Sequence, residues 1–211
     1  MTRPHFAAAW AASQRIYDPA NSAAKVAKVI GGNVAVNINN RDPRQRWANT
    51  CAVRLSYILN YSGMLIPRVP GQTVSGADKR WYFYRGKYLI GFLEQQWGKA
   101  EIVKYPPSGG GTLAGKKGLI LFEVLGWSDA QGHATLFDGS ICYDHCYFNE
   151  PGATYRTDRA NFWSLPLRRD CGMSCCQPLL FWHQQVTRRM RRSLRHRRAH
   201  VPTRRTTRTW C

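Results

Sequence analysis

The segment NTCAVRLSYILNYS, residues Asn49–Ser62, combines a helix start with a nearly unbroken apolar run. Asn49 or Thr50 can cap this helix, because a short polar side chain accepts hydrogen bonds from the free N–H groups of the first turn. Cys51 then stands at the positive end of the helix dipole, which favours the thiolate, the nucleophilic form of cysteine. The segment therefore predicts a largely buried helix with a cysteine at its N-terminus. A buried structural cysteine is the simpler alternative.

The composition of the 211-residue chain is that of a globular protein, with 44% hydrophobic and 12% aromatic residues. This length predicts one domain with a sizeable core. No apolar run reaches the roughly 18 residues of a membrane span. The N-terminal segment lacks the apolar core of a secretory signal, so we expect no signal peptide.

The net charge of +19 is unevenly distributed along the chain. The segment 168–211 holds twelve arginines and one acidic residue, a net charge of +11. Residues 1–167 therefore carry only +8. The charge is not by itself an indication of nucleic-acid binding by the body of the protein.

The predicted helices precede most of the predicted strands, which indicates an α+β fold. We predict that a helix ends at Gly31-Gly32. We also predict irregular structure over residues 33–46 and 64–80, and a flexible glycine-rich loop over residues 108–115. Residues 82–84 begin a short strand or helix, and residues 128–132 form a turn. Helices are expected over 6–17, 22–30, 51–62 and 87–97, and strands over 118–127, 133–137 and from 140 onward.

A hairpin places the second polar group of a possible active site. Asp138-Gly139 predicts a two-residue turn, and the register then sets His133 opposite Asp144. A histidine beside a carboxylate is an oriented general base, although an ordinary surface His–Asp pair is equally compatible. Asp138 is the competing acid, but its place in the turn points it away from His133.

The chain has seven cysteines, an odd number, so at least one is unpaired if the others form bridges. Cys142 and Cys146 flank Asp144, and they can form a disulfide only if the chain bends near Asp144. Such a bridge suits an oxidising compartment. The weaker alternative is a zinc site, with ligands drawn from Cys142, His145, Cys146, Cys171, Cys175, Cys176 and His183.

Four stretches resemble, in this order, the type VI secretion amidase effectors of the fourth family: NTCAVRLSYILNYSG, VSGADKRWY, GHATLFDG and CYDHCYF. The resemblance covers roughly Pro4–Pro166. It implies a papain-like NlpC/P60 fold, in which N-terminal helices pack on an antiparallel sheet. It also implies Cys51 as nucleophile, His133 as general base and Asp144 as the residue that orients the base, without a metal or cofactor.

The resemblance further implies hydrolysis of the γ-D-glutamyl–meso-diaminopimelate bond of the peptidoglycan peptide stem. The Cys51 N–H would bind the oxyanion, with Gln45, Trp47 or Asn49 as weak candidates for a second donor. The implied partners are the type VI secretion apparatus and a cognate, homodimeric immunity protein. The effector would be made in the producer's cytoplasm and secreted into the target cell's periplasm.

We assign residues 1–167 to the amidase domain and residues 168–211 to an arginine-rich tail, disordered or non-native. Residues 179–198 can alternatively form a basic amphipathic helix that binds anionic lipid or nucleic acid. We expect no specific nucleic-acid partner. Two other functions stay open, a papain-like cysteine hydrolase or acyltransferase with another substrate, and a basic binding protein in which Cys51 is structural.

Overall fold

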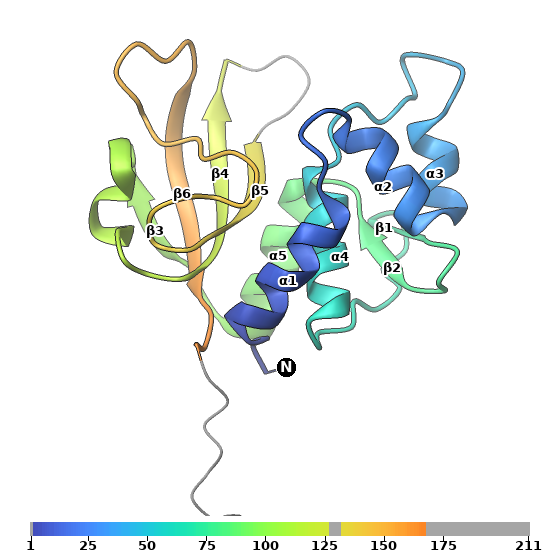
Figure 1. Cartoon of the computed structure of the whole chain (residues 1–211), viewed down its shortest axis with the longest axis horizontal. Coiled ribbons are helices and arrows are strands. Elements are labelled where there is room, and N and C mark those ends of the chain that lie inside the picture. The colour runs from blue at the N-terminus through green and yellow to red at the C-terminus, as the bar shows by residue number, and fades with distance from the viewer. Residues whose placement is uncertain (1, 127–131, 168–211) are drawn as a thin grey trace, which may run out of the picture. The chain divides into compact units, whose positions relative to one another are not determined.

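The computed structural model describes residues 2–126 and 132–167, which form a group of helices and an antiparallel sheet (Figure 1). Most of the predicted turn over 128–132 lies outside the described residues. So do the arginine-rich tail and its possible helix over 179–198. Within the two described ranges, no helix has the length and apolar character that crossing a membrane requires.

The first two helices are α1, Phe6–Ile16, and α2, Ser22–Ile30, and both confirm the predicted helices. The Asn21 side chain accepts a hydrogen bond of 3.0 Å from the Ala24 N–H and so caps α2. Gly31 ends α2 with φ of 64°, a conformation that favours glycine.

Helix α3, Gly32–Ile38, forms at the start of the segment 33–46 that was predicted to be irregular, so that prediction was wrong for residues 33–38, whereas residues 39–46 contain no helix or strand. Two of its apolar residues at helical spacing, Val34 and Ile38, are buried. Packing of this short apolar stripe overrides the low helix propensity of the asparagines around it.

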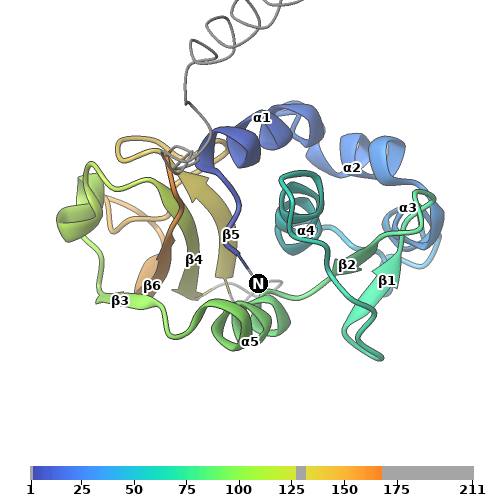
Figure 2. The same ribbon diagram turned by 90° about the horizontal axis from the view of Figure 1, so that it is seen from below.

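Helix α4, Cys51–Tyr61, is the central helix, and every residue from Cys51 to Asn60 is buried. It contacts α1, α5, β2 and β5, and Figure 2 shows these elements arranged around it. Ser56 fixes β2 to the helix, because its hydroxyl accepts a 3.0 Å hydrogen bond from the Phe83 N–H. The predicted buried helix that begins at the cysteine is therefore confirmed.

A small hairpin and a helix follow α4. Strands β1, Thr73–Ser75, and β2, Trp81–Phe83, pair antiparallel, so the segment predicted as loop contains one short strand. Helix α5, Gly86–Trp97, matches the helix predicted over 87–97. Its buried residues are Leu89, Phe92 and Leu93.

The main sheet has the strand order β3-β6-β4-β5, and all neighbours are antiparallel. Its strands are β3 (Glu101–Lys104), β4 (Gly118–Leu125), β5 (Gly132–Phe137) and β6 (Arg156–Ser164). Leu119 and Leu136 belong to the core shared with the helices, while Ile120 and Phe137 belong to a separate core cluster. Alternate residues of β4 and β5 therefore face opposite sides of the sheet, and both sides are buried. The helices and the antiparallel sheet together confirm the predicted α+β class.

The glycine-rich segment after β3, where a flexible loop was predicted, is η1, Ser108–Leu113, which consists of 3₁₀ turns interrupted by a kink at Gly109, Gly110 and Gly111. Gly110 has φ of 87° and lies close to the rings of Phe137 and Phe148. A side chain at this position would be strained and crowded, so the glycine allows close packing here.

The turn after β5 is longer than the predicted two-residue turn. The Asp138 N–H donates to the Ile141 carbonyl at 3.0 Å, and Phe137 forms a bridge with Cys142. The Asp138 side chain accepts from the N–H groups of Ser140 and Ile141, both at 2.8 Å, and this stabilises the wider turn. The predicted register is therefore wrong, and the returning chain is a loop beyond the single bridge.

Candidate active site

Cys51 lies at the first position of α4 and is only 6% exposed. Its N–H donates to the Asn49 side-chain oxygen at 3.0 Å, whereas the Thr50 side chain makes no cap hydrogen bond. Among the described residues, Cys51 alone is a free cysteine. The helix dipole and the first-turn geometry therefore act on a buried, unbridged thiol, as predicted.

His133 comes from β5 and is also buried, with a 9% exposed side chain. Its Nε2 lies 3.0 Å from Asp144 Oδ2, and the ring is close enough to Cys51 for the thiol to raise the pKa of the imidazole. Because Nε2 is engaged with the carboxylate, Nδ1 is the nitrogen available to the thiol. The ring thus lies between the Asp144 carboxylate and the Cys51 thiol.

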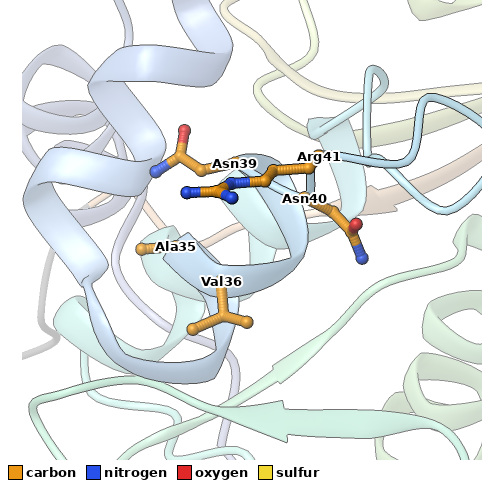
Figure 3. Close-up of a pocket in the computed structure, with 5 residues that line it drawn as sticks. All are labelled: Ala35, Val36, Asn39, Asn40 and Arg41. Atoms are coloured by element: carbon orange, nitrogen blue, oxygen red, sulfur yellow. The ribbon is translucent and has the colours of Figure 1, made fainter.

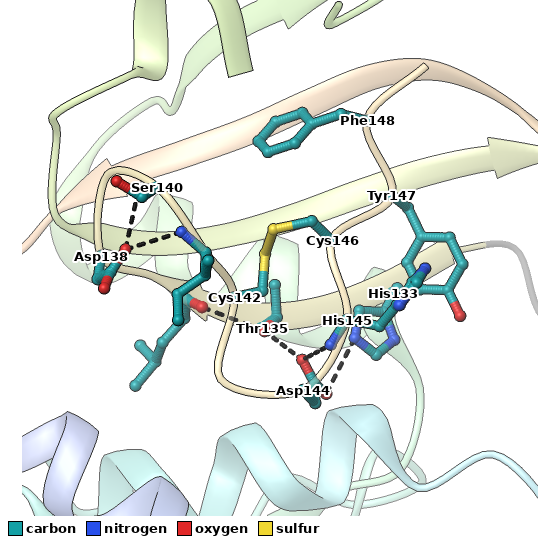
Figure 4. The surroundings of a disulfide bond; sticks show 12 residues. His133, Thr135, Asp138, Ser140, Cys142, Asp144, His145, Cys146, Tyr147 and Phe148 are labelled. Carbon is teal, nitrogen blue, oxygen red and sulfur yellow. Dashed lines mark hydrogen bonds and ion pairs between the residues drawn. A yellow bond between two sulfur atoms is a disulfide. The ribbon is translucent and has the colours of Figure 1, made fainter. Parts of the chain in front are cut away.

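Asp144 lies on the loop after β5, and its carboxylate accepts four hydrogen bonds (Figure 4 shows part of this network). Oδ2 accepts from His133 and from Arg54, the latter at 2.7 Å. Oδ1 accepts from the Thr135 hydroxyl at 2.5 Å and from the His145 N–H at 2.7 Å. The predicted His133–Asp144 contact exists, although it is reached through a bent loop rather than through hairpin pairing.

The bend is closed by a disulfide between Cys142 and Cys146, as predicted. The two Cα atoms lie 5.3 Å apart, much closer than four extended residues would place them. The bridge therefore fixes the loop on either side of Asp144. Both sulfurs are consumed by the bond, and the described ranges contain no group of three side chains suited to a metal.

Arg54 is a site residue that the sequence analysis missed. Its side chain is 7% exposed and contacts the Tyr143 hydroxyl at 3.1 Å, the Ser22 hydroxyl and the face of Tyr17, in addition to Asp144. The sequence did contain an indication of this role. Arg54 is the only charged residue of the predicted helix over 51–62, and it lies three residues after Cys51, on the same side of that helix.

The three groups have mutually dependent pKa values. Burial opposes ionisation of Cys51, but its hydrogen bond with His133, together with the charges of His133 and Arg54, lowers the thiol pKa overall. Burial lowers the pKa of His133, yet the hydrogen bonds and charges of Asp144 and Cys51 raise it to about 9. Burial raises the pKa of Asp144, but its interactions with His133 and Arg54 lower it to about 2. The arrangement favours a thiolate–imidazolium pair at neutral pH.

The Cys51 N–H, which was expected to bind the oxyanion, already donates a hydrogen bond to the exposed Asn49 side chain in the structure. Of the other candidates, Gln45 donates to Asp42 at 3.3 Å, and Trp47 stacks on Tyr84 with ring centroids 5.2 Å apart. Asn49 must therefore move aside before the Cys51 N–H can bind an oxyanion.

A cavity of about 560 Å³ lies at the end of α3, away from these groups (Figure 3). Neither Cys51 nor His133 nor Asp144 lines it. Its lining consists of Ala35, Val36, Asn39, Asn40 and Arg41. We therefore build the candidate site from the Cys51 constellation rather than from this cavity.

A family model described as "Type VI secretion system (T6SS), amidase effector protein 4" matches residues 47–163 of the chain. That span holds Cys51, His133 and Asp144. A comparison with curated protein sequences gives no match.

Three solved structures illustrate the likeness. The effector Tae4 from Salmonella typhimurium, in complex with the immunity protein Tai4 from Enterobacter cloacae, is 38% identical, with a TM-score of 0.68 over 78% of this chain and 100% of that chain. Tae4 in the Tae4–Tai4 complex from Enterobacter cloacae is 39% identical, with a TM-score of 0.68 over 78% and 99%. Tae4 from Enterobacter cloacae without a named partner is 38% identical, with a TM-score of 0.66 over 78% and 99%.

Proposed function

The chain belongs to the type VI secretion amidase effector family 4, and from this we propose that it hydrolyses an amide bond of the peptidoglycan peptide stem with Cys51 as nucleophile. Its fold is the papain-like, NlpC/P60-type α+β fold that the resemblance implied. The observation that supports the assignment is the chain of contacts from Cys51 through His133 to Asp144.

In the first step the Cys51 thiolate attacks the carbonyl carbon of the scissile amide, and the carbonyl oxygen becomes an oxyanion. The Cys51 N–H stabilises this oxyanion once Asn49 has moved aside. The His133 imidazolium then donates its proton to the amide nitrogen, the C–N bond breaks, and the amine leaves. The acyl group remains on Cys51 as a thioester.

In the second step the neutral His133 takes a proton from water, and the resulting hydroxide attacks the thioester. The free acid leaves, and the thiolate–imidazolium pair is restored. Asp144 stays ionised throughout, because its pKa of about 2 lies far below neutral pH. Its role is to orient His133 and to stabilise the imidazolium.

We propose the γ-D-glutamyl–meso-diaminopimelate bond as the bond that is cleaved. In this assignment residues 1–167 are the amidase domain. Membership of an amidase family argues against a basic binding protein in which Cys51 is only structural. Another amide substrate is the competing possibility, and identification of the cleaved products separates the two.

Type VI secretion delivers effectors of this family, and we place the site of action in the periplasm of the target cell. The Cys142–Cys146 disulfide supports that compartment, because such bonds persist in an oxidising environment. The solved complexes pair Tae4 with the immunity protein Tai4. We propose that a cognate immunity homodimer likewise blocks the Cys51 site in the producing cell.

The test is mass spectrometry of purified muropeptides incubated with the wild-type chain, Cys51→Ala and the matched control Cys211→Ala. We expect the wild type and Cys211→Ala to release fragments cut between D-glutamate and diaminopimelate, and Cys51→Ala to leave the stems intact. A folded Cys51→Ala variant with wild-type activity refutes the nucleophile. Absence of cleavage by a folded wild type refutes the substrate.

A further inference from the structure

Arg54 is a buried cation on the helix that carries the nucleophile. Its side chain is 7% exposed, and both neighbours in the chain, Val53 and Leu55, are fully buried. A buried charge is costly unless it is paired and hydrogen-bonded. Since hydrophobic residues surround it on α4, the structure must compensate this cation at a specific place.

Three hydrogen bonds and one ring contact compensate the Arg54 charge. The guanidinium Nη2 donates to Asp144 at 2.7 Å, Nε donates to Tyr143 at 3.1 Å, and Nη1 donates to Ser22. The ring of Tyr17 lies 5.3 Å below the guanidinium carbon. These contacts come from α1, α2 and the loop after β5, so the guanidinium has one orientation.

The contact with Asp144 is made to the same oxygen, Oδ2, that accepts from His133. Arg54 thus approaches the acid from the helix of the nucleophile, while His133 approaches it from β5. With Cys51 and Asp144 negative and His133 and Arg54 positive, the buried charges balance. Without the guanidinium, one negative charge in the site is left without a partner.

We propose that Arg54 is a positioning residue of the amidase, which orients Asp144 toward His133 and keeps Cys51 in its thiolate form. The proposal rests on the assigned roles of these three residues. Arg54 acts through them and does not need to touch the substrate, because each of its three nitrogens already donates to a protein group.

Other titratable groups also lie around the site and must be considered in its pH dependence. Tyr143 hydrogen-bonds to Arg54, Tyr17 packs edge-on against Tyr143, and Tyr147 packs against both His133 and His145. Burial, and then the charge of Asp144, raise the pKa of Tyr143 and of Tyr147. Both phenols therefore stay neutral where the thiol ionises, so neither phenol accounts for a change at acidic or neutral pH in an Arg54 variant.

The experiment uses the full chain with Arg54→Met, Arg54→Lys and the control Arg159→Met, which removes an arginine paired with Glu123 near the surface. The first measurement is the rate at which iodoacetamide alkylates Cys51 as a function of pH, followed by mass spectrometry of the peptide that contains Cys51. This measurement needs no substrate, so it separates failure of this proposal from failure of the proposed reaction.

We expect Arg54→Met to raise the midpoint of alkylation by about one pH unit or more, the size typical of losing a nearby opposite charge. Arg54→Lys should restore part of the shift, and Arg159→Met should leave the midpoint unchanged. In muropeptide assays kcat should fall more than KM rises. If Arg54→Met does not fold, the smaller shift in Arg54→Lys decides the question.

A second measurement tests whether the effect passes through Asp144. We expect Arg54→Lys to reduce kcat by about tenfold in the wild-type background but by less than about threefold in an Asp144→Asn background, as coupled residues behave. Equal reductions in both backgrounds, or alkylation midpoints within about 0.2 pH unit of wild type, overturn the proposal.

Discussion

Asp144→Asn separates the charge of this residue from its shape. The amide keeps the size of the side chain but removes the negative charge that both Arg54 and His133 approach. The lowering of the Asp144 pKa from 3.8 to about 2 corresponds to roughly 2 kcal/mol in favour of the folded state at neutral pH. Leaving Arg54 buried without its counter-charge raises the expected loss toward the 3–5 kcal/mol that is roughly typical of a broken buried pair.

The expected effect on catalysis is larger. Without the carboxylate, His133 is no longer held in one tautomer and its imidazolium is no longer stabilised. In hydrolases with a nucleophile–His–Asp triad, the corresponding Asp→Asn change lowers kcat by about 10⁴-fold. We would measure urea unfolding for stability and muropeptide release for kcat. Asp138→Asn is the matched control, because Asp138 lies six residues earlier and accepts only backbone hydrogen bonds in the turn.

The reasoning is refuted if Asp144→Asn keeps kcat within tenfold of wild type. It is also refuted if Asp138→Asn lowers kcat as much as Asp144→Asn does. A loss of stability below about 1 kcal/mol would contradict the importance of the buried pair, even with activity lost.

Three further predictions concern pH, the disulfide and the oxyanion site. Because the folded pKa of Asp144 is lowered, its stabilisation is present above about pH 4 and is lost as pH falls through about 2, which acid unfolding of wild type and Asp144→Asn would show. Because the folded pKa of His133 is raised, its stabilisation is present below about pH 6.5, and both it and kcat should decline as pH rises through about 9. Cys142→Ser opens a ring of about five residues and should cost about 2 kcal/mol in urea unfolding, with reduced kcat; unchanged kcat would show that hydrogen bonds alone place the acid. Asn49→Ala frees the Cys51 N–H, so kcat should be unchanged or higher while stability falls by about 1 kcal/mol; a tenfold fall in kcat would instead identify Asn49 as an oxyanion donor.

Helix α4, which begins at the proposed nucleophile Cys51, was predictable because its determinants are local. Polar residues before Cys51 and the apolar residues after it specify both its start and its burial. Strand β5 was also predictable from local sequence, because its residues alternate as a strand requires and the turn signal Asp138-Gly139 follows it. Helix α3 was missed because its stability comes from the burial of Val34 and Ile38 against other elements, and an apolar stripe of two residues between asparagines is too short to indicate a helix.

The contact of Asp144 with His133 was predicted correctly, although the hairpin register from which it was predicted is wrong. Hairpin arithmetic assumes a continuous ladder, but the Asp138 side chain widens the turn and the disulfide bends the returning chain. The carboxylate then reaches His133 because Arg54 and Thr135 hold it from other elements. Such long-range contacts depend on three-dimensional packing and leave no periodic pattern in the sequence.

Helix α4 positions both ends of the proposed catalytic chain of contacts, Cys51 and Asp144. Cys51 is its first residue, and Arg54, about 4.5 Å further along the helix axis, holds Asp144. The separation between nucleophile and acid is therefore fixed through one rigid element, while His133 is placed between them by β5. The disulfide limits changes of shape within the loop of Asp144, and a displacement of that loop away from α4 must break the buried Arg54–Asp144 ion pair. The imidazole is consequently held in its working orientation before any substrate arrives, which is the preorganisation that nucleophilic catalysis by cysteine requires.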